Sequence, residues 1–208
     1  MNRFIKKKEH PQICFDFCHP KAVQLIGEHP DVQEKIHAEL DQVFEGCASA
    51  DLAGVTMEQL SRLSYLECAI KESMRLLPIA PLMLREVEKP TTVAGHLLPS
   101  GTIIACCLNV AHHDARQWPQ PELYKPERFL PENAKGRSPF AFIGFSAGPR
   151  NCIGYKFGMI EMKVALAKIL FKYRVTSLQT RDKLKFHAPY LYKCVTPVGF
   201  ELEKRSRD

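Results

Sequence analysis

The stretch Phe-Ser-Ala-Gly-Pro-Arg-Asn-Cys-Ile-Gly, residues 145–154, constrains this chain more than any other part of it. We call it the cysteine loop. Its Cys152 stands at the start of a segment, residues 152–173, whose apolar side chains recur at helical spacing and predict a largely buried helix. The free N–H groups of a helix N-terminus stabilise negative charge, so this position favours a cysteine thiolate.

The other residues of the cysteine loop are consistent with a ligand-binding turn. Gly148 allows the backbone to turn tightly, and Gly154 leaves room for a flat ring to approach. Arg150 supplies a fixed positive charge that suits a carboxylate. A thiolate is a soft ligand that suits iron. The alternative is that Cys152 is a packed thiol, but this leaves the shared spacing of five residues unexplained.

Composition excludes several classes of protein. The chain has 208 residues, of which 45% are hydrophobic and 25% charged, which fits one large or two small globular domains. The net charge is +6, but no dense basic tract with interleaved aromatics indicates nucleic-acid binding. Eight scattered cysteines without a secretory signal predict reduced intracellular thiols. No apolar run approaches the ~20 residues of a membrane span, so we expect no anchor in this chain.

Helices are predicted in the first part of the chain and between the cysteine loop and the C-terminal strands. The pattern predicts a helix over 21–26 and a second one starting at Pro30. Capping boxes at 56–59 and 64–67 predict a short and a longer helix, the latter ending near Leu77 because prolines follow. Together with the short strands predicted elsewhere in the chain, these helices indicate a fold class that is mainly α with small β-sheets (α+β).

Strands are predicted where β-favouring runs are bounded by turn residues. Such runs lie at 83–87, 91–94 and 102–108, and several short strands are expected after Val175. Residues 111–144 are rich in proline and read as a long coil, which inside a compact domain is normally functional or disordered.

The cysteine loop resembles the cysteine-ligand loop of the cytochrome P450 family, the haem-thiolate monooxygenases. Other landmarks of that family follow in its order: the pair Glu72 and Arg75, then Arg85, then the run Pro126–Phe129. The resemblance implies that Cys152 is the catalytic axial ligand of the iron of haem b. It also implies haem contacts by a further set of residues: Phe145, Gly148, Arg150, Gly154 and Arg85.

The resemblance spans residues 21–208 and implies the C-terminal, haem-binding portion of the P450 fold, without its N-terminal half. Residues 1–20 form a divergent segment. The family's oxygen-activating pattern, an acidic residue followed by threonine in a long helix, has no match there, and Pro20 is expected to break such a helix. These features predict a truncated member of the family.

Glu72 and Arg75 illustrate a conflict between two interpretations. Their i, i+3 spacing and their place off the apolar stripe predict an exposed ion pair. The resemblance instead implies that both are buried in a charge network with Arg128. Arg85, a charge in an apolar strand, either faces a haem propionate or is an edge-strand charge.

The resemblance implies a haem-thiolate monooxygenase that inserts one oxygen atom from dioxygen into a lipophilic substrate. Residues 129–134 and 148–152 look most like the eukaryotic branch that hydroxylates fatty acids at or near the terminal carbon. Electrons would come from NADPH through a flavoprotein reductase, and the full-length family member associates with the endoplasmic reticulum membrane. Three lysines either help to dock the reductase or form a solvated helix face: Lys71, Lys156 and Lys163.

Two alternatives remain open from the sequence. The chain could be a non-catalytic haem-binding or interaction fragment that lacks oxygen activation. A zinc module could use Cys14, Cys18 and His19, although no second ligand pair has matching spacing. The resemblance makes His112 and His113 structural residues of a short helix rather than iron ligands.

Overall fold

The structure is a computed structural model that describes residues 13–46, 54–187 and 191–206, with side chains from residue 20 onward. Helices pack into one body, and short antiparallel strand pairs attach to it, so the predicted α+β class is confirmed. The helices are α1 Ile13–Glu28, α2 Pro30–Val43, α3 Met57–Arg62, α4 Ser64–Leu76, α5 Leu108–His112 and α6 Tyr155–Lys172, with the 3-10 turns η1 Pro126–Phe129, η2 Gly148–Arg150 and η3 Arg181–Lys183.

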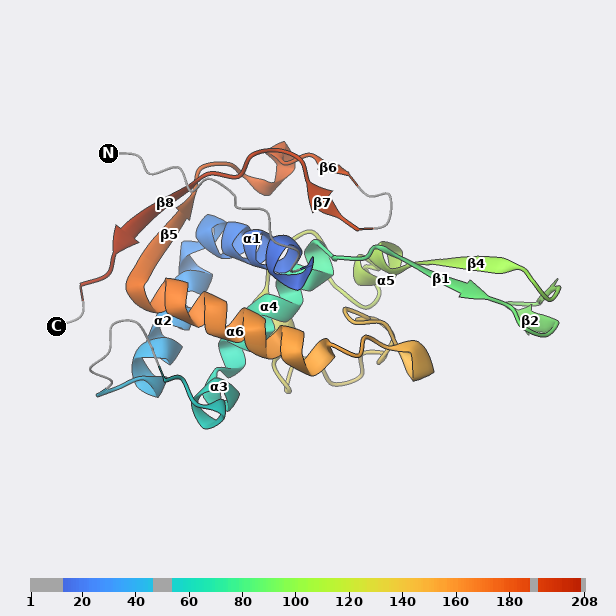
Figure 1. Cartoon of the computed structure of the whole chain (residues 1–208), viewed down its shortest axis with the longest axis horizontal. Coiled ribbons are helices and arrows are strands. Elements are labelled where there is room, and N and C mark those ends of the chain that lie inside the picture. Colours follow the sequence, from blue (N-terminus) through green and yellow to red (C-terminus); the bar gives the residue numbers. More distant parts are fainter. Residues whose placement is uncertain (1–12, 47–53, 188–190, 207–208) are drawn as a thin grey trace.

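The hydrophobic core lies among α1, α2, α4 and α6. Each helix contributes a side chain that is 0% exposed: Ile26, Ile36, Leu66 and Leu166. Figure 1 shows α1 lying over α4 and α6, with α2 at the side away from the β1–β4 pair. Because one apolar cluster joins all four helices, this body holds the rest of the chain in place.

α1 begins earlier than the predicted range 21–26. It starts at Ile13 and passes through Pro20, so the expected break at that proline is wrong. After Pro20, the buried side chains of Ala22, Leu25 and Ile26 pack into the core. This burial offsets the backbone hydrogen bond that a proline cannot donate.

Two of the predicted helix starts are confirmed. Pro30 occupies the first turn of α2. At α3 the Thr56 hydroxyl accepts from the Gln59 N–H at 3.2 Å, and the Gln59 side chain accepts from the Thr56 N–H at 3.0 Å. These reciprocal bonds form the predicted capping box.

The second predicted capping box, at residues 64–67, is wrong. Ser64 is already helical, and the first turn of α4 is capped from α2 by Glu39. The Glu39 carboxylate accepts from the N–H of Tyr65 at 2.6 Å, from the N–H of Leu66 at 2.9 Å and from the Ser64 hydroxyl at 3.2 Å. A carboxylate so placed also meets the positive end of the helix dipole.

The strands form antiparallel pairs. β1 Leu82–Glu86 pairs with β4 Ile103–Cys107, and β2 Thr91–Val93 pairs with β3 His96–Leu98 around a turn at Ala94 and Gly95, both with positive φ. β5 Tyr173–Ser177 pairs with β8 Phe200–Lys204, and β6 Phe186–His187 pairs with β7 Lys193–Cys194. The strand β3 was not predicted.

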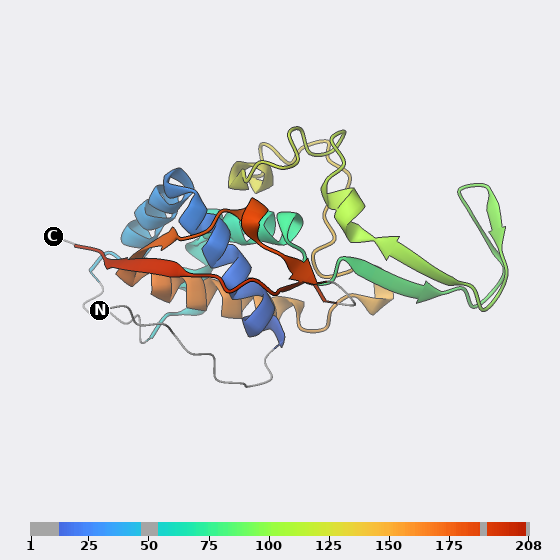
Figure 2. The ribbon, with the colours of Figure 1, turned by 90° about the horizontal axis from the view of Figure 1, so that it is seen from above.

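The β1–β4 pair extends away from the helical body, with β2 near its far end (Figures 1 and 2). We call residues 82–107 the ribbon. Its large apolar side chains include Leu84, Leu97 and Ile103, which are 53%, 70% and 69% exposed. Much of the apolar surface of the ribbon is therefore uncovered.

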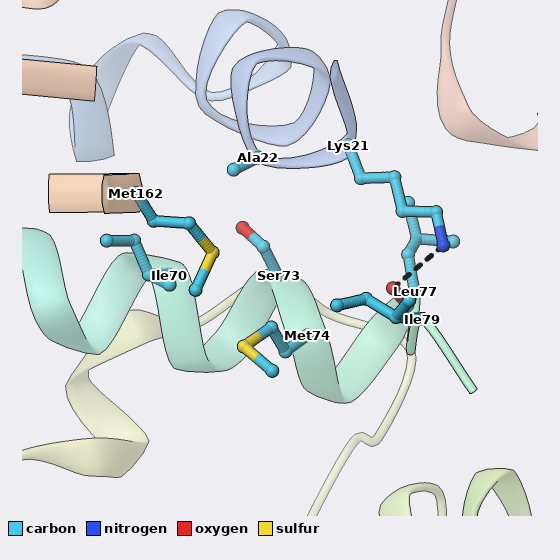
Figure 3. A pocket seen from close by; sticks show the side chains of 8 residues that line it. All are labelled: Lys21, Ala22, Ile70, Ser73, Met74, Leu77, Ile79 and Met162. Carbon is cyan, nitrogen blue, oxygen red and sulfur yellow. Dashed lines mark hydrogen bonds between the residues drawn. The ribbon is translucent and has the colours of Figure 1, made fainter. Parts of the chain in front are cut away.

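Lys21 ties α1 to the end of α4. Its buried ammonium group donates to the main-chain oxygen of Pro78 at 2.9 Å. It also donates to the main-chain oxygen of Leu77 at 3.4 Å (Figure 3). Beside it, Met74 and Met162 line a cavity of only about 10 Å³. A cation among the last carbonyls of a helix satisfies acceptors that the helix itself leaves unpaired.

Candidate functional site

The cysteine loop closes on itself through main-chain hydrogen bonds. The Cys152 N–H donates to the Phe145 oxygen at 2.9 Å, and the Asn151 N–H donates to the Gly148 oxygen at 3.1 Å. Gly148 has φ +77°, a conformation in which glycine avoids the strain of a side chain. The loop is thus a defined turn that presents Cys152 just before α6.

The Cys152 side chain is exposed, three residues before the first residue of α6. The Tyr155 N–H donates to the Cys152 oxygen at 3.2 Å, which joins the cysteine to the first turn. A Cβ atom built on Gly154 would lie 3.8 Å from the Cys152 sulfur, so a side chain there would cover one side of the thiol. The glycine leaves that side open.

The surface next to Cys152 is apolar. Ile153 is fully exposed and Phe157 is 71% exposed, whereas Phe145 is partly buried against the Tyr155 ring with centroids 4.9 Å apart. An exposed soft sulfur ligand beside uncovered apolar side chains fits a flat, largely apolar group that carries iron. The residues present therefore suit a haem.

Arg85 reaches the cysteine loop from β1. Its guanidinium donates to the Ser146 hydroxyl at 3.0 Å and to the Leu84 oxygen at 2.8 Å. Ser146, with φ +66°, is a contact that the sequence analysis missed, because no spacing rule singles out that serine. Arg150 lies in η2 with its side chain exposed.

Glu72 and Arg75 form a bidentate ion pair inside the molecule. Arg75 Nε lies 2.7 Å from Glu72 Oε2, Arg75 Nη2 lies 2.9 Å from Glu72 Oε1, and both side chains are 0% exposed. Arg128 Nε stands 3.3 Å from Glu72 Oε1, an ion pair in which the Nε–H lacks hydrogen-bond geometry. Burial lowers the pKa of Arg128, and Glu72 opposes that shift.

The coil after α5 explains why this ion pair is buried. Arg75 also donates to the main-chain oxygens of His112 and Pro121, each at 2.7 Å, and the Lys125 N–H donates to Glu72 at 3.0 Å. The coil folds over the polar side of α4 and satisfies its charges. The exposure that periodicity predicts is therefore wrong.

A surface hollow of about 320 Å³ separates the cysteine loop from α4. Its lining includes Lys71, Phe145, Asn151, Tyr155 and Met159. Just before the cysteine loop, the chain passes close to Met74 of α4 at Gly144. A Cβ atom on Gly144 would come within 2.7 Å of the Phe142 ring and 3.0 Å of the Met74 methyl group. This glycine lets the cysteine loop approach the helical body.

The three lysines differ in their surroundings. Lys163 is buried, and its ammonium group contacts Glu67 at 2.7 Å and donates to the Leu60 oxygen at 3.0 Å. Both predictions for Lys163, docking and a solvated face, are wrong, because it links α6 to α3 and α4. Lys71 pairs with Glu67 at 2.7 Å, and Lys156 is exposed.

Other candidate sites receive little support. The side chains of Cys14, Cys18 and His19 lie outside the described residues, so the zinc alternative has no geometry. Elsewhere in the described chain, no group of three or more His, Cys, Asp or Glu residues is placed to hold a metal ion. His112 is fully buried and His113 partly so. Among the described helices, none combines the length and apolarity needed to span a membrane.

Comparison with known proteins agrees with this geometry. The family model "Cytochrome P450" matches residues 22–199. The chain is 41% identical over 187 residues to cytochrome P450 4V2 of Homo sapiens, covering 90% of this chain and 35% of that protein. It is 42% identical over 160 residues to cytochrome P450 4c3 of Drosophila melanogaster, covering 77% of this chain and 29% of the relative.

The match covers most of the chain but only part of its relatives. The probable cytochrome P450 4d20 of Drosophila melanogaster is 43% identical over 184 residues, which are 88% of this chain and 35% of the relative. The chain thus spans about a third of the length of the curated relatives it matches. On the family match over residues 22–199, the chain belongs to the cytochrome P450 family.

Proposed function

We propose that this chain provides the haem-thiolate portion of a monooxygenase, with residues 21–208 as its haem-binding unit and residues 1–20 as a separate segment. The reaction inserts one atom of dioxygen into a C–H bond of a lipophilic substrate such as a fatty acid. The other oxygen atom is reduced to water by two electrons and takes up two protons. The observation that carries the proposal is the exposed Cys152 thiol, held at the start of α6 by a closed loop.

Each residue of the cysteine loop has a role in this proposal. Cys152 would hold the iron of the haem through its sulfur, which is exposed just before the first turn of α6. Ile153 and Phe145 offer apolar contacts to the ring, while Gly148 and Gly154 give the loop its turn and the sulfur its open side. When bound, the haem would supply the activation of dioxygen.

Two arginines are proposed to hold the carboxylates of the cofactor. Arg85 lies against the loop through Ser146, and Arg150 is exposed in η2. Guanidinium groups match carboxylates through paired, charge-assisted hydrogen bonds. The Glu72, Arg75 and Arg128 network is proposed to be structural, since it anchors the coil that leads to the loop.

The electrons are proposed to come from NADPH through a flavoprotein reductase, with the enzyme at the endoplasmic reticulum membrane. Lys156 and Lys71 are the two lysines near the loop that retain exposed or partly exposed ammonium groups for an acidic partner. Fatty acids are the proposed substrates because the runs at 129–134 and 148–152 resemble the fatty-acid branch of the family.

The test is to express the chain with haem and to record the spectrum of the reduced carbon-monoxide complex. A red-shifted Soret band of the thiolate type is expected for the wild type and for Cys107→Ala, which removes another exposed cysteine. The band should vanish in Cys152→Ala. A band that survives this substitution, or a wild type that retains no haem, would contradict the proposal.

Turnover is measured separately, with NADPH, a reductase and a fatty acid. Hydroxylated product that depends on all three supports the monooxygenase. Haem binding of the thiolate type without product would favour the non-catalytic alternative.

A further inference from the structure

His112, the last residue of α5, connects the buried charge network with the segment that leads into the cysteine loop. It is 0% exposed. Its main-chain oxygen accepts from Arg75 Nη1 at 2.7 Å, and its ring Nε2 lies 3.0 Å from the Ile143 main-chain nitrogen. The ring also stacks on Phe142, with centroids 5.3 Å apart. One residue thus contacts α4 on one side and the approach to the loop on the other.

The direction of the ring hydrogen bond fixes the tautomer of His112. A main-chain N–H can only donate, so Nε2 is the unprotonated acceptor and the proton resides on Nδ1. Nδ1 is buried without a hydrogen-bond partner. Burial lowers the pKa of His112 to about 4, and the charges of His113 and Arg75 act in the same direction. The ring therefore remains a neutral acceptor at neutral pH.

The chain after Ile143 has little freedom to absorb a displacement. Gly144 lies so close to Phe142 and Met74 that no side chain would fit there without movement. Gly144 bridges to Ser146, which is held by Arg85, and the Phe145 oxygen accepts from the Cys152 N–H. A shift of the Ile143 main chain would therefore pass to Cys152 through a short series of tight contacts.

We propose that His112 is a positioning residue for Cys152: by accepting from the Ile143 N–H, it holds the cysteine loop in register with the Arg75 network. Its role toward iron rests on the proposed function, in which Cys152 is the ligand. The positional role itself does not, because the contacts involved belong to the chain alone. Loss of the acceptor would leave the Ile143 N–H without its partner and free the loop.

The first arm of the test uses the chain without haem and measures amide hydrogen exchange by NMR. In His112→Phe, which keeps an aromatic ring but removes the acceptor, exchange at Ile143 and Cys152 should be about tenfold faster than in the wild type. His112→Gln, whose amide oxygen can replace Nε2, should restore slow exchange. Amides in α2 serve as the internal control and should not change, which separates local release of the loop from a general loss of stability.

A shorter variant keeps the test decisive if His112→Phe does not fold. His112→Asn is a neutral amide like His112→Gln, but it is one methylene shorter and cannot place its oxygen at the Nε2 position. It should behave like the phenylalanine variant. Unchanged exchange at Ile143 and Cys152 in His112→Phe, or in His112→Asn where that is the variant that folds, would overturn the proposal.

The second arm uses the haem-loaded chain and the reduced carbon-monoxide spectrum. The fraction with the thiolate-type band should fall at least twofold in His112→Phe and recover in His112→Gln. An unchanged fraction in His112→Phe would contradict the role toward iron. If even the wild type retains no haem, the proposed function fails, while the exchange measurements still decide whether His112 positions the loop.

Discussion

The helical body and the ribbon with its neighbouring cysteine loop differ in how their apolar side chains are covered. In the body, Ile36, Leu66 and Leu166 are wholly buried, and even Glu72 and Arg75 are 0% exposed. On the ribbon and beside Cys152, large apolar side chains face outward. Burial of apolar side chains therefore stabilises the helical body. The exposed apolar side chains of the ribbon and beside Cys152 are instead available to contact a ligand or another surface.

The charge network lies at the boundary between these two regions. Glu72 and Arg75 belong to α4, whereas Arg128 and the main-chain partners at Pro121 and Lys125 belong to the segment after α5. The hydrogen bonds of the network thus hold the irregular main chain after α5 against the helical body. The following predictions test this division, beginning with the largest expected effect.

Replacing Arg75 by alanine should destabilise the fold by about 3–5 kcal/mol, because Glu72 would be left buried with a weaker partner. Urea unfolding followed by circular dichroism measures the loss. The matched control is Arg116→Ala, which removes an ion pair whose arginine is 86% exposed, and it should change stability very little. Equal effects of the two substitutions would contradict a body stabilised by its buried network.

Leu166→Ala in α6 should cost about 2–5 kcal/mol, since it removes a wholly buried side chain and leaves a cavity. Leu97→Ala on the ribbon removes the same atoms from a position that is 70% exposed, and stability should stay within about 0.5 kcal/mol. The comparison is made by urea unfolding. A large loss at Leu97 would show that the ribbon shares the core's stability.

Acid should weaken the body through His37, which is buried in α2 with no hydrogen-bond partner for either ring nitrogen. Burial, and then the charge of Arg205, lower its pKa from 6.5 to about 4; Arg174 adds to this, while Glu34 and Asp41 oppose it. The folded state thus disfavours the proton. Below pH 6.5 the unfolded state gains that proton first, so stability falls by about 1.4 kcal/mol per pH unit until the pH approaches 4.

Unfolding curves at pH 7 and pH 5 measure this effect. In His37→Phe the loss between the two pH values should be smaller than in the wild type by about 2 kcal/mol. His112→Gln should reduce it similarly, because the pKa of His112 is also lowered to about 4. Identical pH profiles for wild type and His37→Phe would mean that the ring is hydrated rather than buried.

Glu39→Ala should destabilise by about 0.5–2 kcal/mol, because it removes the acceptor for three donors at the start of α4. Glu39→Gln retains one oxygen and should lose less. Glu45→Ala, at an exposed position just after α2, is the control and should have little effect. Urea midpoints distinguish these variants, and a loss as large for Glu45 as for Glu39 would argue against the cap.

Much of the helical body could be predicted from the sequence because its signals are local. The apolar stripe of α4, the proline at the start of α2 and the Thr56 capping box each lie within one turn or one helix. The start of α4 was predicted, but its cap could not be, because that cap comes from Glu39, 26 residues before Tyr65. Likewise, the course of α1 through Pro20 depends on packing against other helices.

The candidate site was less predictable from spacing alone. The family resemblance pointed to Cys152 and its loop. Periodicity placed Glu72 and Arg75 in solvent, because it does not register the later main-chain groups that cover them, such as the Pro121 oxygen and the Lys125 N–H. The contact of Ser146 with Arg85 and the bond from Ile143 to His112 also join residues distant in sequence. Such contacts emerge only when the chain is folded.

The cap that Glu39 provides has a consequence for the order of assembly. An isolated α4 would begin with unsatisfied N–H groups, and its first turn gains its acceptors only when α2 has docked beside it. Helix formation at Tyr65 and docking of α2 should therefore belong to the same kinetic step. If that step precedes the folding barrier, Glu39→Ala will slow folding; if it follows, the substitution will instead speed unfolding.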